Sequence, residues 1–147
     1  MTARIPLALV FIGALATALA AHEKVQNPAV LAWMDLMVKI ADNTKIMGEM
    51  AKGERPFDAG TAQEAAANIA LDASRIAELF ETPQTDPHSE ALPAIWEDFS
   101  DFAQQATALE AAARAAEAAA TLPDLQNGMT GIARTCLDCH ESYRQKN

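Results

Sequence analysis

Apolar residues recur along most of the chain at intervals of three and four, which is the period of an amphipathic helix. No segment alternates apolar and polar residues for long, and the helix-favouring residues Ala, Leu, Glu, Gln and Met dominate. Glycine and proline interrupt the pattern at residues 52–58 and 82–93, and Pro123 marks a third, weaker interruption. These interruptions predict four helices, at about residues 28–51, 61–81, 93–120 and 124–146.

Each predicted helix carries one apolar face. The face of the first helix contains Val30, Trp33, Met37, Ile40, Thr44 and Met47. The face of the last helix contains Leu125, Met129, Ile132, Cys136, His140 and Tyr143. Four amphipathic helices with short connections predict an all-α fold, an antiparallel up-down-up-down four-helix bundle.

Local signals set the expected helix starts. Thr61 and Glu64 have the spacing of a capping box, and Pro93 suits a first helical turn. Asn127-Gly128 is a common turn dipeptide, so the start of the last helix is expected to be irregular. Alternatively, Gly128 and Gly131 allow a flat ring to approach the backbone closely.

The N-terminal residues have the pattern of an export signal. Arg4 precedes an uncharged apolar stretch over residues 5–19, and small residues follow at the spacing that a signal peptidase reads. The alternative, an uncleaved membrane anchor, is disfavoured because the stretch is shorter than the ~20 residues that span a bilayer. We therefore predict a cleaved signal peptide at residues 1–21, one periplasmic domain at residues 22–147, and no membrane span after cleavage.

The chain is acidic. Its formal charge is −9, and removal of Arg4 with the signal peptide makes it −10. Such a surface repels nucleic acid and anionic lipid, and it suits a partner with a basic docking face. The alternative is a solvated acidic coat that serves only solubility.

The chemistry resides in the run from Cys136 to His140, which contains both cysteines of the chain in the pattern Cys-x-x-Cys-His. Residues three apart share one face of a helix, so the thiols of Cys136 and Cys139 can each add to one vinyl group of a haem. His140 can then offer an imidazole nitrogen to the iron. The pattern predicts one haem c, held through two thioethers, with its iron.

Three other interpretations of the cysteines are weaker. A thioredoxin-like pair needs a βαβ context, which the sequence does not show. A zinc site needs a fourth ligand, and neither His22 nor His88 stands at a recognisable spacing. A buried cysteine pair, or a disulfide closing so small a loop, leaves the adjoining His140 unexplained.

Methionine is the residue type available for the far side of the iron. Residue for residue, Met34, Met37, Met47, Met50 and Met129 are expected to pack in the core, as are Trp33 and Trp96. However, a haem within a bundle needs a neighbour on its second face, and the first predicted helix is rich in methionine.

With the motif at the end of a four-helix pattern, the chain resembles the cytochrome c′ family, the class II c-type cytochromes. The resemblance spans nearly the whole predicted mature chain. It rests on Lys52-Gly53-Glu54 with Pro56-Phe57-Asp58, on Leu92-Pro93 with Ile95-Trp96, and on residues 136–144 with Glu141, Tyr143 and Arg144.

The resemblance implies a role for individual residues. Cys136 and Cys139 would hold the haem, His140 would be the proximal ligand, and Arg144 would lie near it one turn later. The family's distal residue stands fifteen positions before Lys52, which is Met37. In one branch of the family this position leaves the iron five-coordinate and high-spin, and in another a methionine binds the iron.

The sequence also departs from the family pattern. Trp33 stands where high-spin members usually carry arginine, which favours the methionine-ligated branch. Asp138 and Ala133 replace residues that are often small or glycine, which affects only details of haem packing.

We therefore expect an electron carrier rather than an enzyme, because no nucleophile–base pair or catalytic carboxylate pair is recognisable. The alternative is a high-spin protein that binds NO or CO at an open iron site, and a thiol–disulfide enzyme is a third, remote option. Small-residue helix faces are compatible with a homodimer, which the resemblance also implies.

Overall fold

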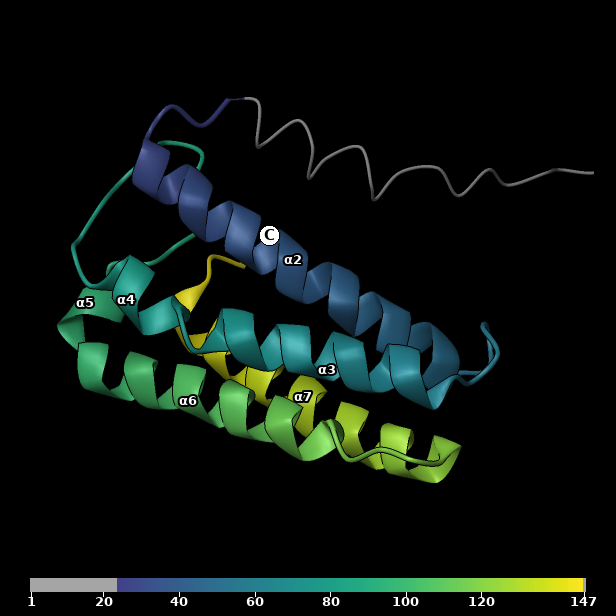
Figure 1. The fold of residues 1–147 in the computed structure, drawn as a ribbon. Helices are drawn as coiled ribbons and strands as arrows, with labels where there is room; N and C mark the ends of the chain where they lie inside the picture. The colour runs from purple at the N-terminus through teal and green to yellow at the C-terminus, as the bar shows by residue number, and fades with distance from the viewer. Residues whose placement is uncertain (1–23, 147) are drawn as a thin grey trace, which may run out of the picture.

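The computed structural model describes residues 24–146, so the predicted signal peptide and His22 lie outside the described residues. Four long helices form the molecule: α2 (Pro28–Ala51), α3 (Ala59–Ala73), α6 (Phe99–Ala116) and α7 (Leu122–Tyr143). Two short helices, α4 (Ile76–Phe80) and α5 (Ala94–Glu97), lie together at one end (Figure 1). Each long helix packs against the next, and α7 returns to α2, so the predicted four-helix bundle is confirmed. Within the described residues, extended pairing is limited to one isolated bridge.

The bounds predicted for the first helix are those of α2. Asn27 caps its start, because the side-chain Oδ1 accepts a hydrogen bond from the backbone N–H of Ala29 at 2.9 Å. Pro28 occupies the first turn, where its missing N–H costs nothing. At the other end Gly53 adopts a φ of 76°, a left-handed conformation that only glycine adopts cheaply and that terminates the helix.

The second predicted helix is two helices, and the predicted cap was wrong. Asp58 caps α3, because its Oδ1 accepts from the N–H of Thr61 at 2.7 Å and the helix begins at Ala59. The helix breaks after Ala73, where the Ser74 hydroxyl donates to the carbonyl of Leu71 at 2.8 Å. Local hydrogen bonds of this kind compete with the helical ladder, so the chain restarts as α4.

The third predicted helix is also interrupted and ends earlier than expected. Asp98 leaves the helical conformation and its side chain accepts from the N–H of Asp101 at 3.2 Å, which caps α6 and separates it from α5. The helix ends at Ala116 rather than near residue 120. The carbonyl of Ala119 instead accepts from the side-chain amide of Gln63 at 3.0 Å.

Helix α7 is regular from its first turn. A capping box between Thr121 and Asp124 begins it, so the expectation of an irregular start at Asn127-Gly128 was wrong. It ends at Tyr143 rather than near residue 146, because the chain then pairs with the loop before α5. The N–H of Gln145 donates to the carbonyl of Glu90 at 2.8 Å.

The core differs from one end of the bundle to the other. The end that contains α4 and α5 is aromatic: Trp33 stacks on Phe80 at 4.3 Å, and Phe102 meets Tyr143 edge-on at 5.3 Å. The opposite end combines small side chains, namely Ala62, Ala65, Ala66, Ala113, Ala116 and Ala119, with the fully buried Met47, Met50 and Leu125. None of the helices among residues 24–146 has the length and apolarity needed to cross a membrane.

Candidate haem site

The two cysteines lie one turn apart on the inner side of α7. Both are free thiols, half-buried, and packed against the hydrophobic core. Burial raises the pKa of Cys136, and burial together with the charges of Cys136 and Asp101 raises the pKa of Cys139 to about 11. At neutral pH both sulfurs are therefore protonated and uncharged in this environment, which suits thiols that face an apolar group rather than a metal cation.

His140 follows at the rim of the bundle, beside a surface hollow lined by Leu137, Glu141 and Arg144. Although the residue is exposed overall, partial desolvation lowers the pKa of its imidazole. The charge of Arg144 lowers this pKa further, while Glu90 acts in the opposite direction. The neutral imidazole is the form that ligates iron, so the surroundings favour the binding-competent state.

Arg144 is held close to His140 by the backbone and by an acidic partner. Its N–H donates to the carbonyl of His140 at 3.2 Å, which is the last helical hydrogen bond of α7. Its guanidinium Nε donates to Glu90 at 2.7 Å and a second nitrogen forms an ion pair with the same carboxylate. This part of the expected arrangement, with Arg144 one turn past His140, is present in the structure.

Met37 lies on the side of α2 that turns toward α7. The helices are antiparallel, and a methyl added at Gly48 would lie 3.8 Å from the Cε at the end of the Met129 side chain, an ordinary contact. Met37 is eleven residues before Gly48, and His140 is eleven residues after Met129. Eleven residues are three helical turns and about 16 Å, so we expect the two residues to lie at a similar level on neighbouring helices. Met37 is half-buried and packs against the core.

Trp33, one turn before Met37, belongs to the core. It is 2 % exposed, and its indole N–H donates to the carbonyl of Leu79 at 2.7 Å. Trp96 lies 5.9 Å from it and donates in the same way to the carbonyl of Phe80 at 2.8 Å. The two indoles thus tie α4 to the bundle, and the expectation that they are core residues holds for Trp33 fully and for half-buried Trp96 in part.

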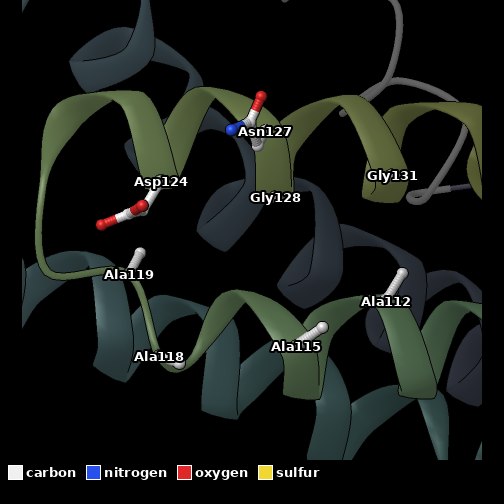
Figure 2. A pocket seen from close by; sticks show the side chains of 8 residues that line it. All are labelled: Ala112, Ala115, Ala118, Ala119, Asp124, Asn127, Gly128 and Gly131. Atoms are coloured by element: carbon white, nitrogen blue, oxygen red, sulfur yellow. The ribbon is translucent and has the colours of Figure 1, made fainter.

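The glycines of α7 serve helix packing. A methyl group added at Gly128 would lie 2.8 Å from the Cβ of Ala116, so glycine is required for the close approach of α6 and α7. Figure 2 shows the shallow groove between these helices, lined mainly by alanine and glycine with Asp124 and Asn127. The alternative role, close approach of a flat ring to Gly128, is therefore wrong: helix α6 occupies that side.

Sequence reasoning missed three polar residues of this region. Asp101 accepts a hydrogen bond from the Tyr143 hydroxyl at 2.6 Å and another from the Gln105 amide at 2.7 Å. Glu90 pairs with Arg144 from a loop. Tyr143 and Asp101 are 42 residues apart in the chain, and Arg144 and Glu90 are 54 residues apart. No local sequence pattern signals pairs at such distances.

A zinc site finds no support here. Among residues 24–146, no group of three or more His, Cys, Asp or Glu side chains could hold a metal ion. The donors near one another on α7 are two neutral thiols and the imidazole that follows them, and both cysteines are half-buried and pack against the hydrophobic core. This set fits a flat, largely apolar group that is held covalently and ligated through nitrogen, which describes haem c.

A profile of the family described as Cytochrome C′ matches residues 29–144. The chain belongs to the cytochrome c′ family. The match covers all five candidate site residues, from Met37 to Arg144. As a member of this family the chain is an electron-transfer haem protein, and haem c with its iron is its cofactor.

Individual relatives agree with this assignment. The chain is 43 % identical over 118 residues to cytochrome c-554 of Cereibacter sphaeroides, which covers 76 % of this chain and 77 % of that protein. Its fold is similar to that of cytochrome c′ from Rhodopseudomonas palustris, with a TM-score of 0.76 and 30 % identity over 83 % of this chain and 99 % of the other. A nitric oxide complex of a cytochrome c prime variant from Alcaligenes xylosoxidans is also similar, with a TM-score of 0.71 and 26 % identity, covering 80 % of this chain and 94 % of that one.

Proposed function

We propose that the chain is a periplasmic electron carrier, not an enzyme, in which α7 holds the haem and α2 supplies the distal iron ligand. Cys136 and Cys139 form the two thioethers, His140 ligates the iron on the proximal side, and Met37 ligates it on the distal side. Arg144 lies one turn after the proximal histidine, and its charge adds to the desolvation that lowers the pKa of the imidazole. The bound haem supplies one-electron chemistry, and the protein sets its potential through ligands, burial and nearby charge.

The level of Met37 relative to His140 carries this proposal. The Met129 side chain of α7 reaches the Gly48 position of the antiparallel α2, so residues three turns from this contact are expected at a similar height. A methionine thioether is a soft ligand that favours reduced iron, so histidine–methionine ligation raises the potential and suits an electron carrier. It also closes the site to weak ligands, because an incoming molecule must displace the sulfur.

The test is the ferric spectrum of the purified holoprotein beside that of Met37→Ala. Mass spectrometry first checks that each polypeptide retains one haem after denaturing acid extraction, which covalent attachment requires. The wild type is expected to be low-spin with a methionine–iron charge-transfer band. Met37→Ala is expected to become high-spin and to bind CO readily. Met34→Ala is the matched control: it alters a half-buried methionine of the same helix and is expected to leave the spin state unchanged.

A high-spin wild type would instead favour a second function, the binding of NO or CO at an open iron site. The observation that keeps this alternative in view is the nitric oxide complex of the related cytochrome c prime variant. In that case Met37 packs beside the haem without ligating it, and Met37→Ala leaves the spin state as it was.

The expected redox partner has a basic docking face. The basic residues nearest the motif are each paired with an acidic neighbour, as Arg134 with Asp138, Arg144 with Glu90, and Lys146 with Glu141. They therefore leave little positive charge to oppose the net charge of the chain. We expect the second-order rate of electron transfer with a basic partner to fall as ionic strength rises, whereas a flat rate would contradict electrostatic docking.

A further inference from the structure

A half-buried carboxylate lies beside the haem-binding turn of α7. Asp101, in the first turn of α6, accepts two hydrogen bonds at the same oxygen: one from the Tyr143 hydroxyl at 2.6 Å and one from the Gln105 amide at 2.7 Å. Neither donor is positively charged, and no ion pair of Asp101 with a basic side chain is found among the described residues. The carboxylate is therefore held by neutral donors, which keep its negative charge in place without cancelling it.

The direction of the Tyr143 side chain places this charge near Cys139. Tyr143 is four residues after Cys139 on α7, so the two side chains lie on one face of the helix. Side chains on a helix lean toward its N-terminus, over the residues three and four positions earlier. The Tyr143 hydroxyl, and with it Asp101, consequently lies on the side of α7 that carries Cys139.

The hydrogen bond from Gln105 to Asp101 leaves another polar atom of Gln105 without a partner. Its amide N–H donates to Asp101, and this leaves its side-chain oxygen buried with no hydrogen-bond partner. An unsatisfied buried carbonyl is unfavourable, so the orientation of the amide is dictated by the need to hold Asp101. The hydrogen bond from Tyr143, followed by that from Gln105, also lowers the pKa of Asp101, and the group is ionised at neutral pH.

We propose that Asp101 is a positioning residue for the redox reaction: its carboxylate, fixed by Tyr143 and Gln105 beside the Cys139 thioether, lowers the reduction potential of the haem. A fixed negative charge near the iron stabilises the ferric form, which carries one more positive charge than the ferrous form. The charge acts from α6, across the helix interface, on a group attached to α7. This inference rests on the proposed attachment of the haem at Cys136 and Cys139.

The experiment is a potentiometric titration of holoproteins at pH 7, followed by the haem absorption. Asp101→Asn preserves the shape of the side chain and removes its charge, so its midpoint potential is expected to be more positive than that of the wild type. Asp101→Glu restores the charge and is expected to return the potential toward the wild-type value. Glu64→Gln is the matched control, because it removes the same charge from an exposed site on α3 at the other end of the bundle.

Tyr143→Phe separates charge from structure, because it removes a hydrogen bond and keeps the carboxylate. Its potential is expected to rise less than that of Asp101→Asn, because the charge remains and only one of the two hydrogen bonds that hold it is lost. The proposal is overturned if Asp101→Asn shifts the potential no more than Glu64→Gln, or if Tyr143→Phe shifts it upward as far as Asp101→Asn does. Asp101→Ser replaces the Asn variant if that variant does not accumulate with haem. Haem that extracts freely from the wild type would refute the attachment, whereas retained haem with an unchanged potential would refute only the role of Asp101.

Discussion

The two ends of this bundle solve the packing of four helices in different ways. At the end formed by the start of α7, small residues let the helices approach until only glycine fits, as Gly128 does against Ala116. At the other end, the aromatic rings of Trp33, Phe80 and Phe102 pack against one another in the core. Both cysteines and Met37 are half-buried and pack against the core.

The contrast separates a part of the molecule that the chain packs by itself from a part that its cofactor completes. Alanine and glycine side chains bury little apolar area each, but they bring α6 and α7 into direct contact, as Gly128 does with Ala116. Aromatic rings and flexible methionines bury more area and adapt to a large flat group. We call the end that contains α4 and α5 the aromatic end, and the end at the start of α7 the alanine end. We therefore expect haem removal to loosen the aromatic end and to leave the alanine end largely intact.

Loss of the cofactor is the largest expected effect. Cys136→Ala combined with Cys139→Ala prevents attachment, and the apolar surface that faces the haem loses its partner. Cavities of that kind cost several kcal/mol, so the free energy of unfolding should fall by on the order of 3–5 kcal/mol. Thermal unfolding and the near-UV signals of Trp33 and Trp96 measure the change. Hydrogen exchange should remain slow near Ala113 and become fast near Trp33.

An unchanged melting temperature with sharp near-UV signals would contradict this prediction, since the aromatic end would then pack without the cofactor. Equal loss of hydrogen-exchange protection at both ends would contradict the expected difference between the aromatic end and the alanine end.

A smaller and opposite pair of effects is expected at the alanine end. Alanine in place of glycine favours a helix by roughly 0.5–1 kcal/mol, so Gly131→Ala, whose added methyl meets only an ordinary contact at 3.8 Å, should stabilise the protein. Gly128→Ala places a methyl 2.8 Å from the Cβ of Ala116 and 3.3 Å from its Cα, and overpacking of this kind costs about 1–3 kcal/mol. The variant should therefore be destabilised. Denaturant titrations of the two holoproteins measure the difference, and equal stabilities would show that the helices separate easily.

The smallest expected effect is on the loss of folding stability at acidic pH. The Tyr143 hydroxyl first, and Gln105 second, lower the pKa of Asp101 at the aromatic end. The Thr121 side chain lowers that of Asp124 at the alanine end. A carboxyl with a lowered pKa stabilises the fold above its ordinary value of 3.8, and this stabilisation is lost as the pH falls through the lowered value. Stability between pH 5 and pH 2 should therefore fall less steeply in Asp101→Asn and in Asp124→Asn than in the wild type.

Because the two carboxylates lie at opposite ends, their effects should add in the double variant. Chemical denaturation at a series of pH values tests this, and a double variant no flatter than either single one would show that the ends are coupled.

Much of this arrangement could be predicted from sequence because it is local. The bounds of α2 follow from Asn27, Pro28 and the glycine that ends the helix, all within a few residues of the feature that they determine. The Cys-x-x-Cys-His motif is equally local, since one helical turn relates both thiols and the imidazole. The family resemblance, now shown, also rested on such short stretches.

Helix interruptions were harder to predict, although their causes are short-range. Asp58 and Asp98 are both caps, but a capping residue competes with other polar residues nearby, and the sequence equally allowed Thr61. The break at Ser74 depends on the carbonyl to which its hydroxyl donates. The packing of α4, held by hydrogen bonds from Trp33 and Trp96, stabilises this arrangement.

The chain by itself determined the helical period, the cofactor chemistry and the sequence distance from Lys52 to Met37, because each depends on residues close together along the chain. Only the tertiary structure decided that Gly128 packs against Ala116 and that the Tyr143 hydroxyl donates to Asp101. These contacts join residues that are distant in sequence, and many alternative pairings satisfy the same apolar pattern. The choice among them is made by side-chain shape and hydrogen-bond geometry once the helices pack.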